Sequence, residues 1–328
     1  MEHRENLVFK GAEPQCLGSS PLPGEALKLS GPEGEPEPIT FEEGKDYVID
    51  YMAGTVTRTE SSRIPDWREH PAYGLKTFDH LALPYYSNAG FTCSISYRAA
   101  DSRTEYTEDN KQTYDLLKSK LPQLFDRLTA DKEAVCVIFG DSISTGAEAS
   151  RPELSFFGRY IAELRNRYPE SAIQAVMKAV GGETSSQGLQ RIEEVVAAQP
   201  DLVLIGYGMN DQNRNSDGSN FVSVQTYERN IRQMVDVIRS RTGADILLFT
   251  SCLPNPRWIF ASDNVRDYAD ALRRIAADSG AALADVQTRW EQVLSTGKSH
   301  ESLLLNNVNH PNDYGHELYY SVLNQYLD

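Results

Sequence analysis

The chain has 328 residues, 40% apolar and 24% charged, so it can bury a large core and is typical of a folded globular protein of about two domains. Its formal net charge of −15 argues against nucleic acid or an anionic membrane as a partner, because both would repel it. No apolar run of about 18 residues predicts a membrane span, and residues 1–10 lack the apolar core of a signal peptide. We therefore expect a cytoplasmic protein.

The cysteines give no indication of a metal site. Cys16, Cys93, Cys136 and Cys252 do not have the spacing of metal ligands, and the last two lie in apolar runs where a reduced, packed thiol is expected. We expect neither a metal nor another cofactor.

Residues 1–110 predict a small antiparallel β domain of the sandwich or jelly-roll kind. They begin rich in Gly and Pro, as in 31–38, and then carry runs in which β-branched and aromatic residues alternate with polar ones. The clearest runs are 46–51, 54–58 and 90–97. A substrate platform, an oligomer contact and simple packing all remain open as the role of this domain.

Residues 111–133 are expected to form a helical connector between two domains. Apolar side chains of 112–128 fall on one side of a helix, although Pro122 favours a kink or a break.

From Ala134 onward, short apolar runs alternate with amphipathic segments, which is the pattern of βα units around a parallel sheet. The runs are 134–139, 172–178, 202–207, 245–250 and 281–285. Apolar residues at helical spacing predict helices within 154–168, 227–238 and 313–327. We therefore predict a three-layer α/β catalytic domain over residues 134–328.

Polar signals follow three of these strands, and a fourth precedes the last helix. They are Gly140-Asp141-Ser142, Gly181-Gly182, Gly208-Met209-Asn210-Asp211 and Asn307-Val308-Asn309-His310. Ligands of open parallel sheets gather at the carboxyl ends of the strands, where the loops after the strands lie. The fourth signal can fold back onto the same edge.

Ser142 is the candidate nucleophile, although each signal taken alone is more often a structural turn. The backbone N–H groups of Ser142 and Gly182 and the side-chain amide of Asn210 would together form an oxyanion hole. Asp141 and Asp211 are expected to support these loops. Because one such donor contributes about 3 kcal/mol to the transition state, we predict that Asn210→Ala severely lowers the rate and leaves the fold intact.

His310 is the candidate base, because a serine hydroxyl is a weak nucleophile unless an adjacent group takes its proton. His316 falls one turn into the predicted C-terminal helix and is expected to be structural.

These four blocks resemble the signature of the SGNH hydrolases, the GDSL-like esterases and lipases, over residues 134–328. The resemblance implies a flavodoxin-like sheet of five parallel strands in the order 2-1-3-4-5, a strand count that the apolar runs predict on their own. It also implies a serine esterase with Ser142, Gly182, Asn210 and His310 in the roles given above.

One position departs from the family pattern, which has Asp where this chain has Asn307. A neutral amide can accept a hydrogen bond from the imidazole but cannot stabilise its positive charge. Three interpretations remain open: a Ser-His dyad, an acid from elsewhere such as Asp313, or a weakened enzyme. We favour the dyad, which predicts that Asn307→Ala lowers turnover much less than His310→Ala.

The substrate is indicated only by a few side chains. Tyr207, Asn255 and Trp258 are placed by the sequence where they could border a pocket, and aromatics beside polar groups suit a sugar ring. We expect a short-chain O-acyl esterase acting on an acetylated carbohydrate. A lipid or thioester hydrolase and a degenerate, glycan-binding hydrolase are the alternatives, and the fold does not choose among them.

Overall fold

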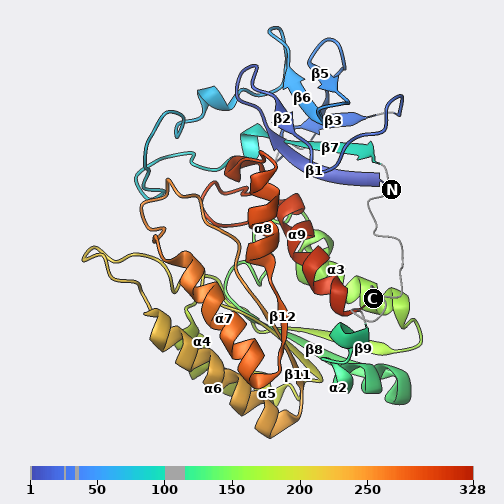
Figure 1. The fold of residues 1–328 in the computed structure, drawn as a ribbon, viewed down its shortest axis with the longest axis vertical. Helices are drawn as coiled ribbons and strands as arrows, with labels where there is room; N and C mark the ends of the chain where they lie inside the picture. Colours follow the sequence, from blue (N-terminus) through green and yellow to red (C-terminus); the bar gives the residue numbers. More distant parts are fainter. Residues whose placement is uncertain (1, 26, 34–36, 100–114, 328) are drawn as a thin grey trace. The chain divides into compact units, whose positions relative to one another are not determined.

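The computed structural model describes residues 2–25, 27–33, 37–99 and 115–327 (Figure 1). They fall into two units, each assembled from separated parts of the chain. The first unit holds the described residues of 1–105 together with 254–259 and 290–315, and the second holds those of 106–253, 260–289 and 316–328. The expected domain boundaries at residues 110 and 133 cut the chain into continuous segments, whereas each unit combines separated segments. The expected boundaries stay predictions.

A five-stranded parallel sheet forms the centre of the second unit. Across the sheet the strands follow the order β9-β8-β10-β11-β12. Counted along the chain from β8 as strand 1, this is the predicted order 2-1-3-4-5. All five predicted runs are strands: β8 (Glu133–Gly140), β9 (Ala172–Met177), β10 (Leu202–Gly206), β11 (Asp245–Phe249) and β12 (Ala282–Ala284). Every residue of β10 is buried, as expected for a central strand covered by helices on both faces.

Helices cover both faces of this sheet, which confirms the three-layer prediction. In Figure 1, α4, α5, α6 and α7 lie on one face and α3 on the other. The helices after β8 are α3 (Phe156–Arg167), α4 (Ser185–Gln190), α5 (Ile192–Ala197), α6 (Val224–Thr242), α7 (Val265–Ser279), α8 (Val286–Ser295) and α9 (Asp313–Leu323). Short 3-10 turns are η1 (Trp67–Glu69), η2 (Ala89–Phe91), η4 (Pro152–Leu154), η5 (His300–Ser302) and η6 (Asn324–Tyr326).

The longest helix, α6, shows why these segments are helical. Ser223 caps its first turn by accepting a hydrogen bond from the Thr226 N–H at 3.3 Å, and Gly243 ends it with a φ of +74°, which glycine adopts without strain. Its buried stripe of Ile231, Met234 and related side chains packs on β10 and β11.

The predicted helix over 112–128 is broken in the structure. Residues 115–118 form a helical turn, and α2 (Pro122–Asp126) begins anew and continues as the π-helical turn η3 (Arg127–Asp131). Proline lacks a backbone N–H and fits the first turn of a helix, so the chain restarts at Pro122. Residues 112–114 lie outside the described part of the chain.

Two antiparallel sheets build the β part of the first unit and confirm its predicted class. One sheet has the order β1-β7-β3-β4, from β1 (Glu2–Val8), β7 (Thr92–Arg98), β3 (Lys28–Gly31) and β4 (Ile39–Thr40). The other has the order β2-β6-β5, from β2 (Gln15–Cys16), β6 (Thr55–Arg58) and β5 (Tyr47–Asp50). Side chains of both sheets, among them Leu29, Val56 and Ile95, share one core.

Late segments of the chain pack into this first unit. Lys298 forms a buried ion pair with Glu5, and its Nζ also donates to the Cys16 carbonyl oxygen at 3.1 Å. The Asn88 side-chain amide donates to the Leu304 carbonyl oxygen at 2.8 Å. Segment 290–315, which includes His310, is therefore held by residues from the start of the chain.

Candidate active site

The turn after β8 presents Ser142 half-buried at the carboxyl end of the strand. The Ser142 carbonyl oxygen accepts hydrogen bonds from Thr145 Oγ1 at 2.7 Å and from the Ala147 N–H at 3.1 Å. Only glycine fits at position 140, because a Cβ there would lie 2.3 Å from the Gly206 carbonyl oxygen. Hydrogen bonds within the turn and the tight contact of Gly140 with Gly206 thus fix the position of Ser142.

The loop after β9 lies against this serine. A Cβ on Gly181 would be 3.8 Å from Ser142 Cβ, and the Val180 N–H donates to the Gly140 carbonyl oxygen at 2.9 Å. Gly182 has a φ of +79°, which favours glycine, and a Cβ there would meet no atom within 4 Å. The space around Gly182 is therefore open, as a backbone donor to substrate requires.

Asn210 is oriented by the neighbouring loop. Its Nδ2 donates to the Glu183 carbonyl oxygen at 2.9 Å, and the side chain is buried. An amide nitrogen carries two N–H groups, so one can hold the side chain in place while the other is offered to a substrate.

Glu183 ties three parts of this arrangement together, a role that the sequence analysis missed. Its carboxylate accepts two hydrogen bonds from Arg191, at 2.6 and 2.8 Å, and one from the Tyr207 hydroxyl at 3.0 Å. A bidentate pair with a guanidinium is geometrically specific. Because Glu183 follows Gly182 and its carbonyl holds Asn210, this cluster positions two of the three predicted oxyanion donors.

Asp211 joins the Asn210 loop to the start of α4. Its carboxylate accepts hydrogen bonds from the Ser185 N–H, at 3.0 and 3.1 Å, and from the Ser185 hydroxyl. Burial raises the pKa of Asp211 to about 6, against the lowering effect of these bonds. Asp211 therefore holds a loop, as the supporting role predicts.

Asp141 lies beside the nucleophile and is also buried. Its Oδ1 accepts from the Ile143 N–H at 3.0 Å, while Oδ2 has no hydrogen-bond partner among the described residues. Burial raises the pKa of Asp141 to about 7, and the nearby charge of Asp211 adds to the rise.

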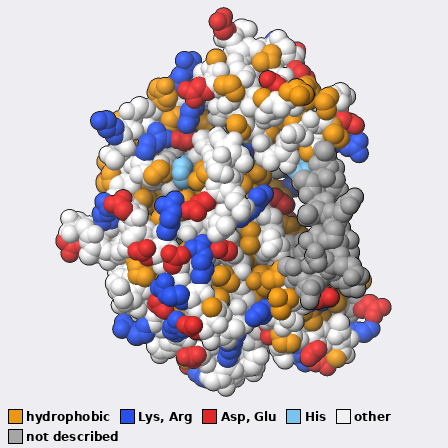
Figure 2. Space-filling model, in the orientation of Figure 1, with side chains coloured by type: hydrophobic (Ala, Val, Ile, Leu, Met, Phe, Trp, Pro, Cys, Tyr) orange, Lys and Arg blue, Asp and Glu red, His pale blue; other side chains and the backbone are white. Residues whose placement is uncertain are grey.

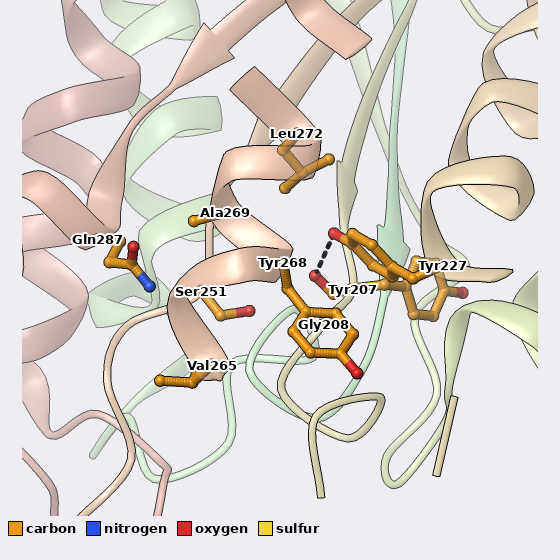
Figure 3. A pocket seen from close by; sticks show the side chains of 9 residues that line it. All are labelled: Tyr207, Gly208, Tyr227, Ser251, Val265, Tyr268, Ala269, Leu272 and Gln287. Carbon is orange, nitrogen blue, oxygen red and sulfur yellow. Dashed lines mark hydrogen bonds between the residues drawn. The ribbon is translucent and has the colours of Figure 1, made fainter. Parts of the chain in front are cut away.

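A small cavity lies beside Gly208, two residues before Asn210 in the chain (Figure 3). Tyr207, Gly208, Tyr227 and Tyr268 are among its lining residues, and the Tyr227 hydroxyl donates to the Tyr207 carbonyl oxygen at 3.0 Å. Its volume of about 10 Å³ suffices for at most a water molecule, so it does not hold a substrate.

The loop that carries His310 belongs to the first unit and is organised by Asn306, which the sequence analysis did not single out. The Oδ1 atom of Asn306 accepts from the N–H groups of Val308, Asn309 and His310 at 2.9–3.0 Å. This fan of bonds fixes the backbone of the loop, and the His310 side chain is half-buried at its end.

Asn307 is fully buried, with a φ of +59°, a conformation that asparagine tolerates better than most residues. Its Oδ1 accepts from Asn255 Nδ2 at 2.9 Å, and the Arg257 N–H fixes the orientation of Asn255 by donating to its Oδ1 at 3.0 Å. The Asn307 Nδ2 has no hydrogen-bond partner among the described residues. The amide oxygen at this family position is thus directed to Asn255.

The alternative acid, Asp313, begins α9 and is buried in the first unit. Burial raises the pKa of Glu33 to about 7, and the nearby charge of Asp313 contributes to the rise.

His316, expected to be structural, is buried and its Nε2 lies 3.1 Å from the Ala147 carbonyl oxygen.

The three residues predicted to border a substrate pocket are all buried and bonded within the protein, and their contact with substrate stays a prediction. Tyr207 holds Glu183, Asn255 holds Asn307, and Trp258 Nε1 donates to His80 Nδ1 at 2.9 Å. Their polar groups make hydrogen bonds within the protein.

The structure divides the predicted residues between the two units. Asp141, Ser142, Gly182, Tyr207, Asn210 and Asp211 lie in the second unit, and Asn255, Trp258, Asn307 and His310 lie in the first.

No group of His, Cys, Asp and Glu side chains suited to a metal ion occurs among the described residues. Over the same residues, no helix is long and apolar enough to cross a membrane.

Residues 138–318, more than half of the chain, match the GDSL-like lipase/acylhydrolase family. The chain belongs to this family. The predicted membership is confirmed, and the chain is a carboxylic ester hydrolase of the GDSL type.

Several relatives of this acylhydrolase are esterases. An acetylxylan esterase of Geobacillus stearothermophilus is 26% identical over 174 residues, which are 49% of this chain and 79% of that protein. A crystal structure of an acetylxylan esterase from that organism is 25% identical with a TM-score of 0.50, and the match covers 59% of this chain and 94% of that one. A two-domain esterase active on acetylated mannans shares the fold, at 22% identity and a TM-score of 0.51 over 64% of this chain and 52% of that one.

Proposed function

We propose that this acylhydrolase is a serine esterase that removes acetyl groups from an acetylated carbohydrate. The observation that carries the proposal is the assembly around Ser142: an open glycine loop and an oriented Asn210 amide, fixed by Glu183 beside the turn that presents the serine. The acetylxylan esterase relative supports acetyl as the acyl group and a sugar as the alcohol.

The proposed reaction has two steps. Ser142 Oγ attacks the ester carbonyl carbon while His310 takes the hydroxyl proton, and the N–H groups of Ser142, Gly182 and Asn210 stabilise the oxyanion. The carbohydrate alcohol leaves with the proton from His310. Water, deprotonated by His310, then attacks the acyl-serine, and acetate and free Ser142 result.

A neutral ester fits the charge of this chain. The formal net charge is −15, and on the face shown in Figure 2 Lys and Arg side chains are interspersed with Asp and Glu. These features support an uncharged sugar ester over a polyanion such as nucleic acid. Action inside the cell stays a prediction.

The test is hydrolysis of nitrophenyl acetate, butyrate and octanoate, followed by acetylated xylo-oligosaccharides, by wild type and Ser142→Ala. We expect Ser142-dependent rates that fall with chain length, and release of acetate from the sugar. Preference for octanoate would favour a lipid hydrolase. Failure of a fluorophosphonate to label Ser142, together with no hydrolysis, would favour a protein that only binds glycan.

A further inference from the structure

A turn-rich segment of the first unit, residues 72–88, exposes several large apolar side chains to solvent. Tyr85 is 88% exposed and Leu81 77%, and Tyr73 and Leu75 are also exposed. The segment contains no helix or strand, and long ordered loops of this kind usually carry function. Large apolar side chains left in solvent on such a loop are available for contact with a ligand.

The segment is held firmly in place. The Phe78 N–H donates to the Arg257 carbonyl oxygen at 2.9 Å, and the Ile259 N–H donates to the Phe78 carbonyl oxygen at 3.1 Å. In Figure 1 the light-blue segment accordingly runs beside the orange loop that contains Trp258. Buried Trp258 supports His80 through its Nε1 hydrogen bond, and Tyr86 packs edge-on against His80 with ring centroids 5.5 Å apart. His80 and Tyr86, which flank the exposed Leu81 and Tyr85 in the chain, are thus held in place through Trp258.

The backbone of Tyr85 is strained without any visible gain in packing. Its φ is +58°, in the left-handed region that bulky residues rarely adopt, at a cost of about 1–2 kcal/mol. The contacts of a buried ring would offset that cost, but this ring is almost fully in solvent. Strain of this kind persists where the position of a side chain matters for function.

Tyr85 is connected to the loop of the proposed base. Ser87 Oγ and the Asn88 N–H donate to the Leu305 carbonyl oxygen at 3.0 and 2.7 Å, and the Leu305 N–H donates to the His310 carbonyl oxygen at 3.0 Å. Only Tyr86 separates Tyr85 from Ser87 in the sequence, so the two Cα atoms are at most about 7–8 Å apart. An oligosaccharide of a few rings that is deacetylated with the help of His310 can therefore reach Tyr85.

We propose that Tyr85, in the segment that His80, Tyr86 and Trp258 hold in place, is a stacking platform for a sugar ring of the acetylated oligosaccharide. The proposal rests on the proposed function and gives the first unit a role in selecting its substrate. An aromatic ring matches the apolar face of a pyranose, and His80 and Asp79, both half-buried, supply polar groups for its hydroxyls.

The test compares Tyr85→Ala with wild type on two substrates, nitrophenyl acetate and acetylated xylo-oligosaccharide. We expect the KM for the oligosaccharide to rise about tenfold or more, with kcat/KM for nitrophenyl acetate unchanged. Tyr85→Trp should restore the oligosaccharide KM. Met52→Ala, which truncates a 94% exposed side chain elsewhere in the first unit, is the matched control and should change neither substrate.

Binding to unacetylated xylo-oligosaccharide by Ser142→Ala, with and without Tyr85→Ala, separates this proposal from the proposed function. Esterase activity on nitrophenyl acetate with no Tyr85-dependent sugar binding would overturn the platform and leave the esterase standing. Equal losses on both substrates would assign Tyr85 to the support of the His310 loop and overturn the proposal. So would a Tyr85 dependence confined to octanoate esters, or a concentration-dependent dimer that Tyr85→Ala abolishes.

Discussion

Asn307 shows how one amide can replace the family's carboxylate without collapse of its loop. Its Oδ1 and its backbone carbonyl oxygen both accept from Asn255 Nδ2, at 2.9 and 3.0 Å. Loss of the side chain would leave Asn255 the second of these bonds, so the loop should tolerate it. A neutral amide whose oxygen already accepts from Asn255 cannot supply the negative charge of a triad carboxylate.

We therefore predict that substitution of Asn307 lowers kcat by less than about tenfold, whereas His310→Ala lowers it by about a hundredfold to ten-thousandfold. Asn307→Gly belongs beside Asn307→Ala, because glycine accepts the φ of +59° that strains alanine. Steady-state hydrolysis of nitrophenyl acetate measures both effects. Equal losses for Asn307→Gly and His310→Ala would show that the amide orients the imidazole and that the dyad interpretation is wrong.

Asp141 predicts a dependence of stability on pH. Its pKa is about 7 in the folded state against an ordinary 3.8, so between these values the folded protein binds more protons than the unfolded chain. The free energy of unfolding therefore falls as pH rises from about 4 to about 7, by at most about 1.4 kcal/mol per pH unit for this group.

Asp141→Asn should remove this contribution, since its oxygen can still accept from the Ile143 N–H and no charge forms at high pH. Relative to wild type, the variant should gain stability between pH 5 and pH 8. Urea unfolding at pH 5, 6.5 and 8 measures the difference. Asp211, with its own pKa raised to about 6, is present in both proteins and cancels to first order. Parallel curves for the two proteins would contradict the prediction.

An ion pair between Arg191 and Glu183 helps to fix the shape of the loop after β9. Arg191 contacts both Glu183, which is buried, and Glu194, which is half in solvent and 3.1 Å away. The two carboxylates share one guanidinium, yet only Glu183 adjoins Gly182 and carries the carbonyl that orients Asn210.

Glu183→Gln should thus lower kcat for nitrophenyl acetate about tenfold to a hundredfold with little change in KM, because the oxyanion donors act on the transition state. Glu194→Gln is the matched control and should leave kcat unchanged. Equal behaviour of the two variants would mean that the pair stabilises the fold only, and melting temperatures of both would show by how much.

Strands and loops of the second unit could be predicted because their signals are local. A fully buried parallel strand such as β10 reads as an apolar run, and the Gly, Ser and Asn residues of the site follow directly at the strand ends. Glu183 escaped prediction because its role depends on Arg191 and Tyr207, which the sequence does not show to be neighbours. The burial of Tyr207 and its hydrogen bond to Glu183 are likewise not visible in the sequence.

The first unit could be predicted only in class. β1 carries Glu2, Arg4 and Glu5 and does not read as a strand, yet Glu5 is buried by its pairing with Lys298, 293 residues away. Contacts this distant leave no periodic signal, so the sequence could not place segment 290–315 with the N-terminal strands. The sequence also does not show which apolar side chains stay in solvent, so it does not single out those near Tyr85.

This assembly predicts that residues 134–328 alone, although they contain every signature block, do not make an active enzyme. The truncated chain lacks Glu5, Ser87 and Asn88, and with them the partners of Lys298 and of the Leu304 and Leu305 carbonyls. We expect the truncated chain to keep the circular dichroism of the α/β sheet domain, because that core lies in the second unit. Its hydrolysis of nitrophenyl acetate should fall at least about a hundredfold through loss of an ordered base.

Lys298→Met in the full chain is the control for this truncation. It leaves Glu5 buried without its partner, which typically costs about 3–5 kcal/mol, but it removes no strand. Activity should survive this substitution at temperatures where the protein stays folded. A truncated chain that hydrolyses nitrophenyl acetate at the wild-type rate would instead show that the His310 loop orders without the N-terminal strands, and that these strands serve substrate selection alone.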